Sequence, residues 1–129
     1  MNGEIYGLGW VKFKGNLFSF FSENSIYIIL WSFTAVLDAY STTMFMKVLG
    51  PESEIHPITR FCSYKAGVDN GPLIAGFLKF TIALPLLVCW KSISKYILTA
   101  GCFLQLYAYH HNMKVYETYS IMKSLYWFQ

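Results

Sequence analysis

The sequence predicts an all-α, polytopic membrane protein: a three-helix transmembrane bundle with amphipathic interfacial helices at both ends. Hydrophobic residues make up 55% of the 129 residues and charged residues 13%, about half the charged fraction of a typical soluble domain. Aromatic residues reach 19%, which suits a chain with two membrane–water interfaces. Apolar stretches of membrane-spanning length alternate with short polar connections. A soluble domain this small has too much surface to carry so little charge.

Residues 1–24 are expected to form a helix that lies in the plane of the membrane surface. Apolar side chains recur there at helical spacing: Tyr6, Trp10, Phe13, Leu17 and Phe20. Polar side chains fall on the opposite face: Lys12, Asn16, Ser19 and Glu23. A helix with two such faces is typical of an interfacial segment. The alternative is a disordered leader.

Three apolar stretches are expected to cross the membrane, at residues 25–49, 72–90 and 96–110. The first can cross ~30 Å of hydrocarbon with some tilt, and the second is near the minimum length. The third is short and contains Gln105, so a re-entrant hairpin is the alternative to a full crossing. Residues 113–129 then carry a second apolar face and are expected to form another interfacial helix.

A polar loop is expected over residues 50–71, between the first two spans. Pro57 suits the first position of a short helix there, because the N–H that proline lacks is not needed at that position. Gly67 suits the C-terminal cap of that helix. The run Asn70-Gly71-Pro72 predicts a turn just before the second span.

Each expected span carries a strongly polar residue beside small residues on the same helix face. The resulting intramembrane polar cluster comprises Asp38, Ser41, Thr42, Lys79 and Gln105. Small residues let helices approach closely, and polar side chains in a bilayer turn towards a protein partner instead of lipid. The three polar faces are therefore expected to meet.

Asp38 and Lys79 are the acid and the base that lie well inside the apolar segments. A lone charge near the bilayer centre costs ~2.5–3.5 kcal/mol on insertion scales, so pairing the two lowers the free energy. One interpretation is a proton or ion relay, and another is a structural pair that fixes the helix register. A third is that Lys79 extends to the loop side while Asp38 is protonated.

Four residues are candidate metal ligands: Glu54, His56, His110 and His111. They share one side of the membrane if the third span crosses it. Carboxylates and imidazoles bind zinc, iron and copper, although no recognised ligand spacing is present. The alternative is that Glu54 caps a helix and the histidines lie at an interface. No cofactor is predicted.

Residues 37–79 resemble a family of small, functionally uncharacterised prokaryotic and phage membrane proteins. The shared core reads as Asp, then Ser/Thr-Thr, a Gly at the helix end, Glu-x-Asn/His-Pro and a Lys in the next span. In this chain it consists of Asp38, Ser41, Thr42, Gly50, Glu54, His56, Pro57 and Lys79. His56 stands where Asn is commoner in the family. The resemblance implies a compact helical membrane unit whose Asp, Glu and Lys matter together, and it implies no known reaction.

The leading functional prediction is a non-catalytic accessory or scaffolding subunit that packs against a larger membrane protein or against itself. Three short spans enclose little volume for a substrate pocket, whereas small-residue faces suit association. The alternative is a small ion- or proton-conducting or transport unit built around Asp38 and Lys79, and the third candidate is a metal-dependent membrane enzyme.

The expected location is the cell inner membrane. Two lysines in the tight connection at residues 91–95 favour a cytoplasmic N-terminus. The net charge of +3 is spread along the chain, so the expected partners are the lipid bilayer and membrane proteins and not nucleic acid.

Overall fold

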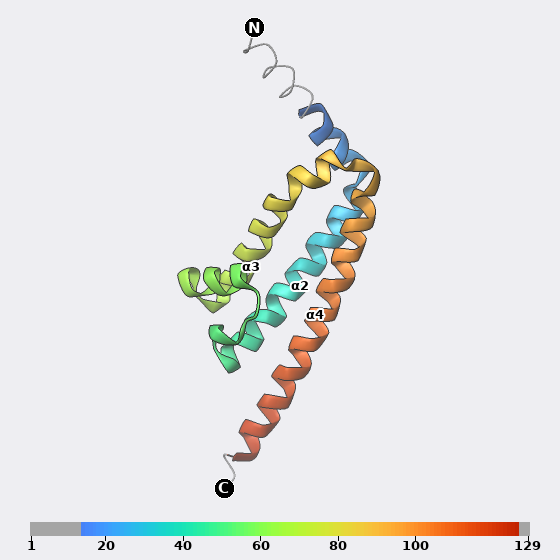
Figure 1. Ribbon diagram of the computed structural model, residues 1–129. Coiled ribbons are helices and arrows are strands. Elements are labelled where there is room, and N and C mark those ends of the chain that lie inside the picture. Colours follow the sequence, from blue (N-terminus) through green and yellow to red (C-terminus); the bar gives the residue numbers. More distant parts are fainter. Residues whose placement is uncertain (1–13, 127–129) are drawn as a thin grey trace.

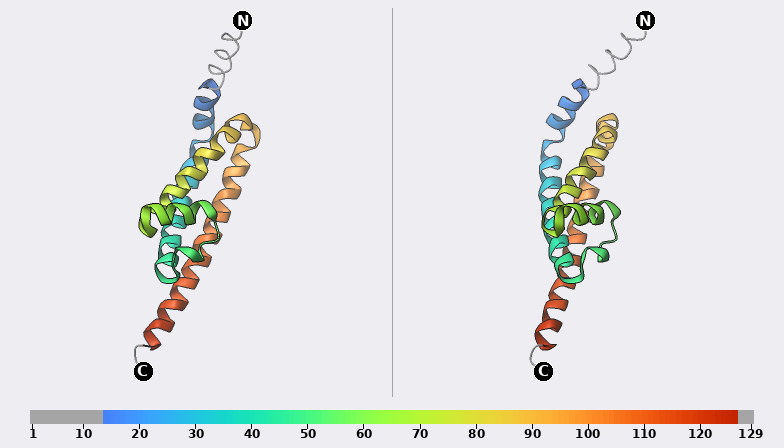
Figure 2. Two further views of the ribbon diagram at one scale, coloured as in Figure 1. Left: turned by 60° about the vertical axis from the view of Figure 1, so that its left-hand side comes forward. Right: turned by 90° about the vertical axis from the view of Figure 1, so that its left-hand side faces the viewer.

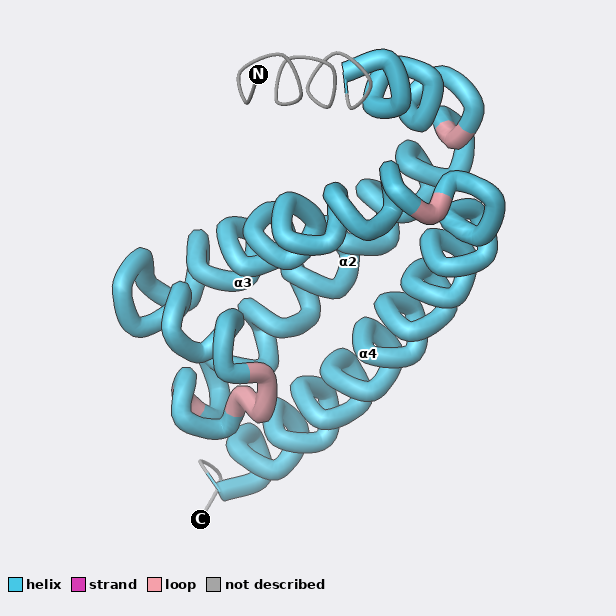
Figure 3. Tube along the Cα trace, turned by 45° about the horizontal axis from the view of Figure 1, so that its top comes forward, coloured by secondary structure: helices cyan, strands magenta, loops and turns pink. Residues whose placement is uncertain are grey.

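The computed structural model describes residues 14–126, and all its long elements are helices. Residues 14–23 are helical and lead into the rest of the chain. The following elements are α2 (Ser25–Leu49), the 3₁₀ turn η1 (Pro51–Ser53), α3 (Pro57–Cys89) and α4 (Lys91–Tyr126). Short loops join them (Figure 3). The predictions for Tyr6, Trp10, Lys12 and Phe13 lie outside the described residues.

The helices α2 and α4 run parallel and side by side (Figures 1 and 2). The long part of α3 runs antiparallel to both and leads from the end of α2 back to the start of α4. Polar contacts mark the alignment of α2 with α4: Thr34 contacts Gln105, and Thr42 contacts Asn112. The two residues of each contact are 71 and 70 positions apart in the sequence. The two helices therefore keep one register along their contact. An up–down–up order of helices is therefore present.

The described chain buries polar side chains and exposes large apolar ones. Its buried polar residues are Asn24, Thr34, Ser41, Thr42, Thr59, Ser63 and Ser94. Large apolar side chains such as Ile29, Phe77 and Phe103 point outward and are more than half exposed. In water such a surface would be an aggregation liability, whereas in a bilayer polar groups face the helix interfaces and apolar groups face lipid.

By length and composition, two helices of the described chain could cross a membrane, α2 and α3. The third expected span, residues 96–110, belongs to α4, which is not one of these two. The expected break between residues 96–110 and an interfacial helix at 113–129 is also absent, because α4 is continuous from Lys91 to Tyr126. No glycine or proline lies between residues 102 and 126, so nothing in the local sequence ends the helix there.

Within α3, Gly67 leaves the helical conformation with φ 81° and ψ 161°, and this divides α3 into residues 57–66 and 68–89. The first part begins with Pro57, as expected. It lies across the bundle, at a steep angle to the rest of α3 (green in Figures 1 and 2). A positive φ strains any residue with a Cβ, so glycine suits the break.

The turn expected at Asn70-Gly71-Pro72 is wrong, because these residues are helical. Gly71 permits a close approach: a Cβ there would lie 2.3 Å from the Cα of Ser63 in the crossing segment. Pro72 lacks the N–H that would bind the carbonyl of Val68 four residues earlier. The hydroxyl of Thr43 on α2 donates to that carbonyl instead, at 3.1 Å. Tertiary contacts thus replace the local turn that the sequence suggested.

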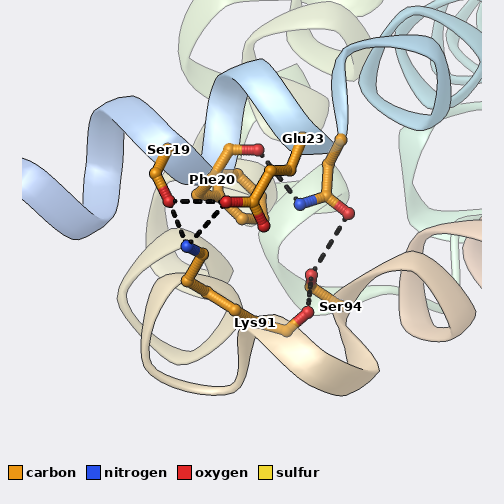
Figure 4. A network of polar contacts seen from close by, with 6 residues as sticks. Ser19, Phe20, Glu23, Lys91 and Ser94 are labelled. Carbon is orange, nitrogen blue, oxygen red and sulfur yellow. Dashed lines mark hydrogen bonds and ion pairs between the residues drawn. The ribbon is translucent and has the colours of Figure 1, made fainter.

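The N-terminal helix packs against the turn between α3 and α4 (Figure 4). Phe20 is fully buried in a core cluster with Leu87, Val88 and Leu98. In the interfacial-helix prediction Phe20 lay on the face towards lipid, so the structure gives this side chain a different partner. Glu23 meets Lys91 at 3.1 Å, on the polar side of the same contact.

Candidate functional site

A cavity of about 230 Å³ lies between α2, α3, α4 and the loop that contains Glu54. We call it the polar cavity. Its polar lining residues are Asp38, Thr42, Glu54, His56, Thr59, Lys79, Gln105 and Asn112. The remaining lining residues are apolar, and most are small: Trp31, Ala35, Ala39, Pro72, Gly76 and Ala108. The small residues leave the space open. Polar side chains from α2, α3, α4 and the loop line it together, which makes it the candidate binding site.

Polar contacts at two levels join α2 to α4 beside the cavity. The hydroxyl of Thr34 lies 2.5 Å from Oε1 of Gln105. About two helical turns further on, the amide of Asn112 donates to the hydroxyl of Thr42 at 3.1 Å and to that of Ser41 at 3.4 Å. These contacts fix the α2–α4 register, which places Gln105 and Asn112 on the cavity wall.

Lys79 and Asp38 line the same cavity without forming an ion pair with each other. The ammonium of Lys79 instead donates to the hydroxyl of Thr59 at 2.9 Å. Both charged side chains are only partly buried. The acid and the base therefore face a shared space, and direct pairing, which the sequence favoured, does not neutralise them.

The loop after α2 supplies the cavity's acidic rim. Gly50 ends α2 with φ 86°, and its N–H donates to the carbonyl of Met46. Four residues on, the carboxylate of Glu54 accepts the backbone N–H of His56 at 2.8 Å. Burial lowers the pKa of His56 below its usual value, the positive charge of Lys79 lowers it further, and Glu54 opposes the shift. His56 is therefore held towards its neutral form.

Towards the α3–α4 turn, aromatic side chains bound the cavity. Trp31 lines it and packs against Phe80 on α3, with ring centroids 4.8 Å apart. Both rings pack against the core cluster around Phe20. This apolar layer stands between the polar cavity and the turn end of the bundle.

Of the residues predicted from sequence, the cavity brings together Asp38, Thr42, Lys79 and Gln105 with Glu54 and His56. Ser41 is fully buried behind the wall, where its hydroxyl lies 2.9 Å from the carbonyl of Asp38.

The two α4 histidines do not join the cavity lining. His110 and His111 are exposed, and His111 stacks on Tyr107. Within residues 14–126, no three His, Cys, Asp or Glu side chains lie close enough together to hold a metal ion. Glu54 and His56 therefore lack the α4 histidines as co-ligands in this arrangement.

Sequence reasoning missed Thr59 and Asn112. Asn112 continues the spacing of Gly101, Gln105 and Ala108 by one further turn, so its place on the cavity face could have been found from periodicity. Thr59 carries no such signal, because its position depends on the crossing angle of residues 57–66.

In comparisons with protein-family models, curated proteins and solved structures, nothing matches this chain. The resemblance of residues 37–79 to the family of small prokaryotic and phage membrane proteins therefore stays a prediction.

Proposed function

We propose that this protein is a small integral membrane transport unit that takes a proton or a small polar solute into the polar cavity. One observation carries the proposal: Asp38 and Lys79 line the same cavity and are not paired with each other. Ionisable groups inside membrane segments are costly and mark substrate or ion pathways. Two such groups facing one space offer a binding site for a ligand that completes their charges.

The membrane location is supported by the outward-facing apolar side chains and by the apolar lengths of α2 and α3. We propose that α4 makes the third crossing, since it runs beside α2 along most of the length of α2 (Figure 2). The inner membrane and a cytoplasmic N-terminus complete the proposal. Such a chain would stay in the membrane pellet after alkaline carbonate washing, and its release into the supernatant would overturn the location.

The size and the boundaries of the cavity favour a carrier over an open pore. Its volume of about 230 Å³ lies below the ~300–1,000 Å³ of sites for drug-sized ligands. The Trp31–Phe80 pair and the core cluster close it towards the α3–α4 turn. Transport would therefore require these aromatic side chains to move, and a carrier opens to one side at a time in this way.

The test is proton flux in proteoliposomes that contain a trapped pH-sensitive dye, with an imposed pH gradient. The wild-type protein should conduct faster than protein-free vesicles, and Asp38→Asn should abolish the excess. Asp69→Asn is the matched control, because Asp69 is an exposed acid that pairs with Lys47 away from the polar cavity. Equal flux in the wild type and Asp38→Asn would overturn the proposal.

A second pair of variants tests the cavity by volume and not by charge. A Cβ at Gly76 meets nothing within 4 Å, and Gly76 lines the cavity, so Gly76→Leu should fill the space and stop flux. Gly15 also faces open space but lies in the N-terminal helix. Gly15→Leu should therefore leave the flux unchanged.

The accessory-subunit function is supported by one different feature. The C-terminal end of α4 projects beyond α2 (Figure 1), and every residue from 117 to 125 is exposed. An exposed helix end that carries Ile121, Met122 and Leu125 suits docking to another membrane protein. Removal of residues 117–129 should then lower the size of the native complex in mild detergent without changing proteoliposome flux.

A further inference from the structure

A second hollow lies on the outside of the α2–α3 contact, and we call it the lipid-side groove. Its volume is about 420 Å³. Its lining residues are Trp31, Ser32, Ala35 and Val36 from α2 and Leu73, Ile74, Gly76 and Phe77 from α3. Val36, Leu73 and Phe77 are each more than half exposed. In a bilayer this groove would face the acyl chains.

The lipid-side groove and the polar cavity share a wall. Trp31, Ala35 and Gly76 line both hollows. Gly76 contributes no side chain, and the position of its missing Cβ is open space. Ala35 contributes a single methyl group. At Ala35 and Gly76, a single small residue therefore separates the polar cavity from the lipid-side groove.

From this continuity we propose that the solute of the polar cavity is the head group of a membrane lipid that joins a primary ammonium to a phosphate, and that its acyl chain lies in the lipid-side groove. The lipid enters sideways between α2 and α3, past Ala35 and Gly76. This inference rests on the proposed function, because it names the solute of the same cavity.

The charges of the cavity match such a head group. Asp38 and Glu54 offer carboxylates to a primary ammonium, which has three N–H donors. Lys79 offers its ammonium to the phosphate, and the amides of Gln105 and Asn112 lie on the same lining. A trimethylammonium group has no N–H to donate, so a choline head group satisfies the carboxylates less well. An anionic head group without an amine brings no cation to either carboxylate.

The polar cavity and the lipid-side groove also match the polar and apolar parts of an amphiphile in size and chemistry. The polar cavity is large enough for a head group and too small for a whole lipid. The groove that adjoins it has apolar side chains and opens outward. A free hydrophilic solute would use the cavity alone, and nothing in its chemistry would use the groove.

Trp31 reports on the groove, because it lines both hollows. Of the four tryptophans, Trp10, Trp90 and Trp127 are changed to Phe, so that fluorescence comes from Trp31 alone. The protein is reconstituted into phosphatidylcholine vesicles with a small fraction of lipid that carries bromine on its acyl chain. Brominated phosphatidylethanolamine should quench Trp31 more than brominated phosphatidylcholine or phosphatidylglycerol at the same fraction, and unlabelled phosphatidylethanolamine should reverse this excess.

Variants assign the selectivity to the polar cavity. Asp38→Asn should reduce the preference for phosphatidylethanolamine about tenfold, the size of one lost charge-assisted hydrogen bond. Glu54→Gln should act in the same direction, and it serves if Asp38→Asn fails to fold. Asp69→Asn, outside the polar cavity, should leave the preference unchanged. Gly76→Leu should remove the excess quenching by blocking the shared wall.

The outcomes separate this inference from the proposed function. Equal quenching by the three brominated lipids overturns the inference. If quenching is equal but soluble phosphoethanolamine raises the melting temperature of the wild type and not of Asp38→Asn, the solute is free and the proposed function stands. If phosphatidylethanolamine quenches selectively but Asp38→Asn and Glu54→Gln both keep the full preference, the head group lies outside the polar cavity and the inference is wrong.

Discussion

The ammonium of Lys79 is held by the hydroxyl of Thr59, at 2.9 Å. Lys79 lies in the long part of α3 and Thr59 in the segment that crosses the bundle before Gly67. One hydrogen bond thus ties the crossing segment to the charged group of the cavity. It also gives Lys79 a partner other than Asp38, so the acid and the base can stay apart across an open space.

We expect Thr59→Val to destabilise the protein by about 1.5–3 kcal/mol, the usual range for a lost hydrogen bond to a charged group. Thr59→Ser keeps the hydroxyl and should cost less. Thermal unfolding in detergent, followed by circular dichroism, measures both. If valine and serine lower the stability equally, the methyl group of Thr59 matters and its hydroxyl does not.

The carbonyl of Val68 gives a second prediction, because Thr43 serves it in place of the N–H that Pro72 lacks. Thr43→Val should cost about 1 kcal/mol, as for a typical hydrogen bond. In a Pro72→Ala background the new N–H can bind Val68, so the same Thr43→Val change should cost clearly less. A double-mutant cycle on unfolding free energy measures this difference. Additive costs would show that the hydroxyl does not replace the missing N–H.

Two glycines of α3 should respond in opposite ways to alanine. At Gly71 a Cβ would lie 2.3 Å from the Cα of Ser63, so Gly71→Ala must push the crossing segment away. At Gly76 a Cβ meets nothing, so Gly76→Ala should stabilise α3 by roughly 0.5–1 kcal/mol through lower backbone entropy. Unfolding in detergent compares the two variants. A neutral Gly71→Ala would contradict the close approach of the two segments of α3.

The contrast between α2 and the loop shows what the sequence could and could not predict. The helix over residues 25–49 and the positions of Pro57 and Gly67 follow from length, apolarity and proline and glycine chemistry, and the structure has them. The turn at residues 70–72 was wrong because contacts with Thr43 and Ser63 outweigh local turn preference. Periodicity placed Asp38, Lys79 and Gln105 each on the small-residue face of its own helix. No local rule gives the angle that brings Thr59 to Lys79.

The contact between Glu23 and Lys91 predicts a pH dependence. Hydrogen bonds from Lys91 and Ser19 lower the pKa of Glu23 below its usual value of 4.5 (Figure 4). A carboxyl group with a lowered folded-state pKa contributes stability above the unfolded value, and that contribution disappears as the pH falls through the folded value. The wild type should therefore be more stable than Glu23→Gln at pH 7. The difference should begin to shrink near pH 4.5 and should vanish once the pH is below the folded-state pKa of Glu23.

Glu23 is exposed, so salt should weaken the same difference. Melting temperatures of the two proteins in detergent, across pH and ionic strength, make the measurement. Glu117→Gln is a control, because Glu117 is an exposed acid on the far end of α4. A difference between wild type and Glu23→Gln that does not change with pH would mean that packing, and not charge, fixes the N-terminal helix.

The parallel course of α2 and α4 predicts the topology of the chain. The contacts of Thr34 with Gln105 and of Thr42 with Asn112 require both helices to run the same way, so the connections at residues 52 and 92 lie at opposite ends of the bundle. Reporter fusions at residues 52 and 129 should report one compartment, and fusions at residues 1 and 92 the other. If both chain termini report the same compartment, α4 does not cross. Gln105 and Asn112 form the α4 side of the polar cavity, and this side would then be open to water. A carrier mechanism needs that side closed.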